Sequence, residues 1–81
     1  MIYDRIIAVI NASQGKWMTL QDIQQEISNT YNQWVSVDFL LLDVTDAYLH
    51  QRIAVQPGDV LMVGQAGGEW MSSGMVHWTN M

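Results

Sequence analysis

Few side chains in this sequence could do chemistry, and the best-spaced pair is Asp46 and His50. A helix would place residues four apart on one edge, where they could share a metal ion with Asp43 or with His77. Two histidines so distant in sequence are a weak signal for such a site. A surface Asp–His pair accounts for the same spacing, so we expect neither a metal nor a cofactor.

The sequence patterns of catalytic sites are also missing. The chain has no cysteine, which excludes disulfides, thiolate zinc sites and cysteine nucleophiles. It contains no nucleophile elbow and no His-Glu-x-x-His motif. The glycines of residues 64–68 lack the lysine and the following helix of a phosphate loop, so they predict a turn. We therefore expect no enzymatic activity.

Charge narrows the choice of partner. Three basic residues, Arg5, Lys16 and Arg52, face eight acidic ones, for a formal net charge of −5. Such a field repels phosphate at long range and favours basic or neutral protein partners.

Residues 1–10 carry charges within an apolar run and lack the basic leader of a signal peptide. No run approaches the roughly 18 apolar residues of a membrane span, so we expect a cytoplasmic protein.

The 81 residues are enough for one domain, which must supply the elements that position these side chains. Apolar residues at helical spacing predict helices over about 2–12, 20–28 and 37–50. Thr19 with Asp22 has the form of a capping box before the second helix, and Ser36 is the expected N-cap of the third. The buried stripe expected for the third helix is Val37, Leu40, Leu41, Val44 and Tyr48.

Two segments allow alternative interpretations. Residues 34–44 are rich in β-branched and aromatic residues and could form a buried strand, but we favour the helix because a strand of that length exceeds the usual range. Residues 52–64 predict a β-wing of strand, turn and strand. The tail, residues 65–81, is rich in aromatic and methionine residues. It either folds back as an extra strand that closes the core or forms an exposed dimer or partner interface.

The order helix, short strand, helix, helix, strand, turn and strand resembles a prokaryotic winged helix-turn-helix domain. It is similar in particular to the small transcriptional regulators of pilus phase variation and of carnitine-type operons. The resemblance covers about residues 2–64 and rests on MTLQDIQQEIS (18–28) and VDFLLLDVTDAYLHQRIAV (37–55). It implies an α+β winged helix of three helices and a small antiparallel sheet. The 28–36 connector departs from the usual tight turn, and the third helix lacks a basic, amide-rich face.

Two functions of different classes are therefore expected. In the first, the chain is a small acidic regulatory or inhibitory protein that acts by binding another protein. Basic proteins and nucleic-acid-binding proteins are the partners that its charge favours. Asp38, Asp43 and Asp46, or Trp70 and Trp78 of the tail, would form the surface. A bacterial phage- or plasmid-type accessory protein fits the size and acidity. The aspartates also fit a merely solvated helix face.

The second function follows from the resemblance, which implies a sequence-specific DNA-binding transcription regulator that acts as a homodimer. Lys16, Gln51 and Arg52 would then lie near DNA. Three aspartates on the expected reading helix oppose this role, because they would face phosphate.

Overall fold

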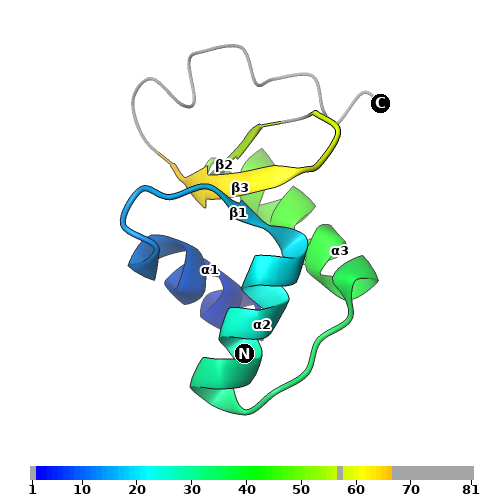
Figure 1. Cartoon of the computed structure of the whole chain (residues 1–81). Helices are drawn as coiled ribbons and strands as arrows, with labels where there is room; N and C mark the ends of the chain where they lie inside the picture. Colours follow the sequence, from blue (N-terminus) through cyan, green and yellow to red (C-terminus); the bar gives the residue numbers. More distant parts are fainter. Residues whose placement is uncertain (1, 57, 67–81) are drawn as a thin grey trace.

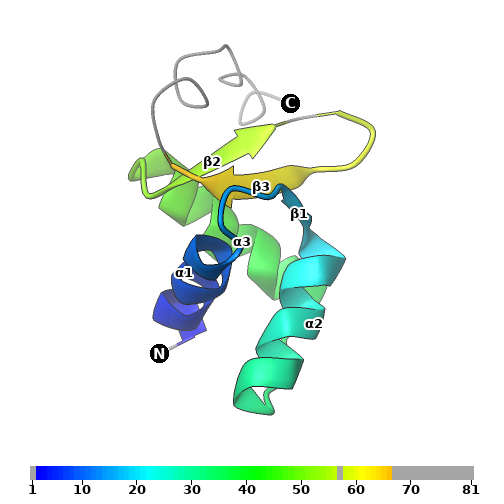
Figure 2. The ribbon, with the colours of Figure 1, turned by 60° about the vertical axis from the view of Figure 1, so that its left-hand side comes forward.

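A computed structural model of the chain describes residues 2–56 and 58–66. These residues form three helices and a three-stranded antiparallel sheet, an α+β architecture (Figure 1). The elements are α1 (Ile2–Ala12), β1 (Met18–Thr19), α2 (Leu20–Tyr31), α3 (Val37–Leu49), β2 (Ile53–Gln56) and β3 (Met62–Gln65). Figures 1 and 2 show the three helices gathered on one side of the sheet.

One hydrophobic core joins the helices to the inner face of the sheet. Its largest fully buried side chains come from all three helices and from two strands: Ile6, Ile10, Ile23, Ile27, Leu40, Val44, Ile53, Val55 and Val63. Ile53 and Val55 are alternate residues of β2 and therefore point to the same face of the sheet. The helical spacing of the other core residues fixes which face of each helix is left outside.

The strand β1 ties the connection between the first two helices to the sheet. Gln14 (φ 56°) and Gly15 (φ 89°) adopt left-handed conformations that turn the chain after α1. Met18 then pairs with Val63 and Thr19 with Met62, both antiparallel. The sheet order is β1–β3–β2, so β1 and β2 lie on opposite edges.

The helix α2 begins at the expected capping box. The Thr19 hydroxyl accepts from the Asp22 amide at 3.0 Å, and the Thr19 amide donates to the Asp22 carboxylate at 3.1 Å. The helix runs to Tyr31, so the expected end near residue 28 is wrong. Asn32 ends it in a left-handed conformation (φ 53°), and its amide donates to the Ser28 carbonyl at 3.0 Å. The connector is therefore residues 32–36.

A contact distant in sequence holds the end of α2. The guanidinium of Arg5 lies 4.6 Å from the ring centroid of Tyr31, a cation–π arrangement. Arg5 also donates to the side-chain oxygen of Gln33 at 2.8 Å. Because Arg5 belongs to α1, these contacts join the first helix to the last turn of α2 and to the connector.

Residues 37–49 are a helix and not a strand. Ser36 caps α3 by accepting from the Phe39 amide at 3.2 Å. The fully buried stripe is Leu40, Val44 and Ala47, whereas Val37 and Tyr48 are half-buried. Leu41 is 38% exposed, so its expected place in the core is wrong. Positions 40, 44 and 47 follow the helical repeat and form the middle of the inner face, so Leu41 lies to one side of it.

The predicted strand, turn and strand are present as β2 and β3, which pair from Ile53 with Gln65 to Gln56 with Met62. Trp70 and Trp78 lie outside the described residues, so both interpretations of the tail stay predictions. None of the helices described is long and apolar enough to cross a bilayer.

Candidate functional site

The outward side of α3 carries large apolar side chains. Leu42 is 68% exposed, Leu49 is 62% exposed and Phe39 is 43% exposed. Separations of three and seven residues place the three side chains on one helix face. Single exposed apolar residues are ordinary on protein surfaces, whereas a contiguous group marks an interaction surface.

Trp34 extends this apolar surface into the connector that precedes α3. Its side chain is 72% exposed. Trp34 and Phe39 line one shallow hollow of about 330 Å³, which Ile2 of α1 also borders. We call the side chains of Trp34, Phe39, Leu42 and Leu49 the α3 patch.

Two carboxylates lie within the same outward face. Asp38 and Asp46 are exposed, and each lies four residues from Leu42, one helical turn before it and one turn after it. The sequence of α3 contains no lysine or arginine. The outward face therefore places acidic groups beside apolar ones along the whole helix.

Asp43 differs from these two aspartates. Its side chain is half-buried, and its Oδ2 atom is fully buried without a hydrogen-bond partner among the described residues. Burial raises the pKa of the Asp43 carboxyl, and the nearby charge of Asp46 raises that pKa further. Of the three aspartates expected on the surface, the structure thus presents Asp38 and Asp46 outward and turns Asp43 toward the body.

Asp46 and His50 form a surface pair. His50 Nδ1 lies 3.5 Å from the Asp46 carboxylate and 2.8 Å from the Asp46 backbone oxygen, and both side chains are exposed. Within residues 2–56 and 58–66, no group of three or more His, Asp or Glu side chains is arranged to hold a metal ion. His77 lies outside the described residues.

The two basic residues proposed for DNA contact each precede a strand that runs antiparallel to β3. Arg52 lies with its guanidinium 5.3 Å from the ring centroid of Tyr3. Lys16 precedes β1 and Arg52 precedes β2, which occupy opposite edges of the sheet. Gln51, with φ 59°, is the left-handed residue that ends α3. Gln51 therefore has a structural role at the end of α3, independent of any contact with DNA.

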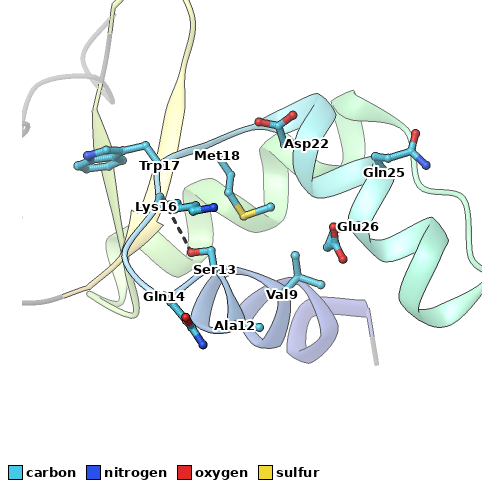
Figure 3. A pocket seen from close by; sticks show the side chains of 10 residues that line it. All are labelled: Val9, Ala12, Ser13, Gln14, Lys16, Trp17, Met18, Asp22, Gln25 and Glu26. Carbon is cyan, nitrogen blue, oxygen red and sulfur yellow. Dashed lines mark hydrogen bonds between the residues drawn. The ribbon is translucent and has the colours of Figure 1, made fainter.

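A second, larger hollow of about 620 Å³ lies between α1, β1 and α2 (Figure 3). Figure 3 shows Val9, Met18 and Glu26 facing the space between the two helices. The Ser13 hydroxyl at its rim donates to the Ile10 carbonyl at 2.6 Å, and none of the ten lining residues is a histidine. The Ser13 hydroxyl thus bonds to backbone carbonyls, of Ile10 and of Lys16.

Sequence reasoning missed the α3 patch. The expected stripe treated Leu40 and Leu41 alike and left Leu42 and Leu49 without a role. The signal was present, because a helix that buries residues 40, 44 and 47 must turn residues 42 and 49 outward. The approach of Trp34 to Phe39 depends on the path of the connector, which helical spacing does not predict.

Comparison with protein-family models, with curated proteins and with solved structures finds no match to this chain.

Proposed function

We propose that this chain is a small winged-helix domain that regulates or inhibits another protein by binding it through the outward face of α3. The winged-helix assignment is supported by the element order α1–β1–α2–α3–β2–β3 and by the sheet order β1–β3–β2. The hairpin of β2 and β3 takes the place of the wing. The connector, residues 32–36, is also shorter than the 28–36 segment expected from the sequence, and its length is therefore nearer to that of a tight turn.

The composition of the outward face of α3 carries the proposal. A helix that reads DNA presents hydrogen-bonding side chains to the base edges and cations to the phosphates. In place of these, α3 presents Leu42 and Leu49, with Asp46 between them. The carboxylate of Asp46 would repel the phosphates of DNA, and the leucines would make no favourable contact with the charged DNA backbone. An apolar centre bordered by polar groups is instead the usual composition of a protein interface.

In this role the chain acts by covering a surface of its partner, with no chemical step of its own. An acidic winged helix of this kind would suit a bacterial or phage regulator that controls a partner by occupancy. The DNA-binding regulator is the competing function, and its contacts would have to come from Lys16, Gln51 and Arg52.

The proposal is tested by capture of native partners with the tagged full-length chain. Three forms are compared: the original sequence, Leu42→Ser, and Gln21→Ser as a matched exposed control on α2. We expect a protein that is retained by the original and by Gln21→Ser and is lost from Leu42→Ser.

A duplex-DNA mobility shift is run in parallel. A shift that weakens steeply with salt and disappears in Lys16→Ala and Arg52→Ala would establish the DNA-binding function. Retention of the same proteins by all three forms would likewise contradict a role for α3.

A further inference from the structure

We propose that the α3 patch binds a basic amphipathic helix, one with apolar side chains along one face and Lys or Arg along its margins. The inference rests on the proposed function and assigns the chemistry of the partner. It is carried by the juxtaposition of four exposed apolar side chains with two exposed carboxylates on a helix whose sequence contains no lysine or arginine.

The apolar part of the surface has the dimensions of a helix contact. Phe39 and Leu49 are ten residues apart, which corresponds to about 15 Å along the helix axis. A partner helix with apolar residues at i, i+3 or i+4, and i+7 presents side chains over a comparable length. The hollow of about 330 Å³ between Trp34 and Phe39 offers one such side chain a place to anchor.

The charged part of the surface selects the sign of the partner. Asp38 and Asp46 lie on the same i, i+4 row as Leu42, so a helix seated on Leu42 has carboxylates near it at two points. His50 beside Asp46 adds positive charge only when it is protonated. The chain as a whole carries a formal net charge of −5. Lys or Arg at the partner's margins would pair with these carboxylates and speed association.

The same charges argue against a second copy of this chain as the occupant. In a two-fold dimer the patch would meet itself, so Asp38 and Asp46 of each copy would enter one interface. The sequence of α3 has no lysine or arginine to neutralise these carboxylates. Like charges brought together in a partly desolvated interface are repelled more strongly than in water. A basic partner meets no such repulsion.

The test uses the full-length chain labelled with ¹⁵N and three synthetic peptides of about 18 residues, long enough to form a helix on binding. The first carries leucines on one helical face and lysines elsewhere. The second has glutamate in place of each lysine. The third has the composition of the first in a scrambled order that forms no apolar face. Affinities are measured by calorimetry, and the binding site is located from amide shifts.

We expect the amphipathic lysine peptide to bind at least about ten-fold more tightly than either control, with its shifts centred on residues 37–49. Leu42→Ser should weaken this binding by about ten-fold, since it removes one buried leucine contact. Asp38→Asn with Asp46→Asn should slow association and reduce the salt dependence. Glu26→Gln with Asp59→Asn is the matched control, because it removes two exposed charges elsewhere and should have a smaller effect.

Equal binding of the scrambled lysine peptide would overturn the proposal, because bulk charge would then be the whole cause. Equal binding of the glutamate peptide, or shifts centred on residues 9–26 at the second hollow, would also overturn it. So would a dimer in sedimentation that Leu42→Ser dissociates, since the occupant would then be a second copy. If Leu42→Ser loses a native partner while the lysine and glutamate peptides bind alike, the proposed function stands and this inference alone fails.

Discussion

Leu42 and Asp46 lie one helical turn apart on the outward side of α3, and both side chains are exposed to solvent. A molecule that covers the apolar group would therefore also meet the carboxylate. A surface of this kind is unfavourable for nucleic acid and is poorly matched to a second copy of itself. Its composition suits a protein partner with apolar and basic groups side by side.

The orientation of α3 predicts that truncating two leucines two positions apart has very different effects on stability. Leu40 is fully buried and Leu42 is 68% exposed. Leu40→Ala should lower the free energy of unfolding by about 2–5 kcal/mol, because it leaves a cavity in the core. Leu42→Ala should change it by no more than about 0.5 kcal/mol. Urea unfolding followed by circular dichroism measures both, and equal losses would show that α3 is rotated from the orientation described.

The end of α3 predicts a stabilising substitution. Gln51 has φ 59°, while its amide donates to Tyr48 and the Arg52 amide donates to Ala47, each at 2.9 Å. This is the Schellman arrangement, in which glycine is the favoured left-handed residue. Gln51→Gly should raise the free energy of unfolding by about 1 kcal/mol, because it removes the strain of a side chain at positive φ. Thermal unfolding measures the change, and a loss of stability would contradict this helix end.

The buried carboxylate oxygen of Asp43 predicts a pH dependence. Burial, followed by the charge of Asp46, raises the pKa of Asp43 above its value in the unfolded chain. A raised carboxyl pKa favours folding while the group is protonated, and this contribution is lost as the pH rises from about 4 through the raised pKa. Asp43→Asn should therefore increase stability at neutral pH and remove that pH dependence.

Urea unfolding of Asp43→Asn at several pH values checks this prediction. Asp38→Asn serves as the control, because Asp38 is exposed on the same helix. The account of Asp43 would be wrong if both variants kept the original pH profile.

The capping box of α2 predicts a coupled loss. Thr19→Ala should cost about 1 kcal/mol, since the Asp22 amide loses its acceptor. Because the two residues also exchange the reciprocal bond, Asp22→Ala in the Thr19→Ala background should cost less than it does alone. Thr30→Ala, an exposed site on α2, is the control and should be near neutral. Strictly additive losses in denaturant unfolding would show that the box does not act as a unit.

The sequence predicted the features that depend on local chemistry. The capping box at Thr19 and the cap at Ser36 follow from side chains that bond to amides three residues on. The end of α2 combines a local signal, Asn32 in the left-handed conformation, with a contact that the sequence does not show, in which Arg5 packs on Tyr31 across a long stretch of chain. Asp43 lies three residues after Leu40 and four before Ala47, so helical spacing places it at the margin of the buried stripe once that stripe is known.

The sequence predicted the charged residues of the candidate site but not its apolar residues. Asp38 and Asp46 were expected on the surface, and they lie there. The apolar members were missed because three consecutive leucines, residues 40–42, do not by themselves state which of them faces the core. That choice is made by packing, in which Ala47 completes the inner stripe that Leu40 begins.

Site-specific cross-linking tests the central claim most directly. A photo-reactive phenylalanine analogue is placed at position 42 of the full-length chain, and in a second form at position 29, an exposed site on α2. The account predicts that position 42 cross-links to a protein partner in the native host and that position 29 does not. Cross-links from position 42 to DNA, or equal protein cross-linking from both positions, would contradict the claim that the outward face of α3 binds a protein.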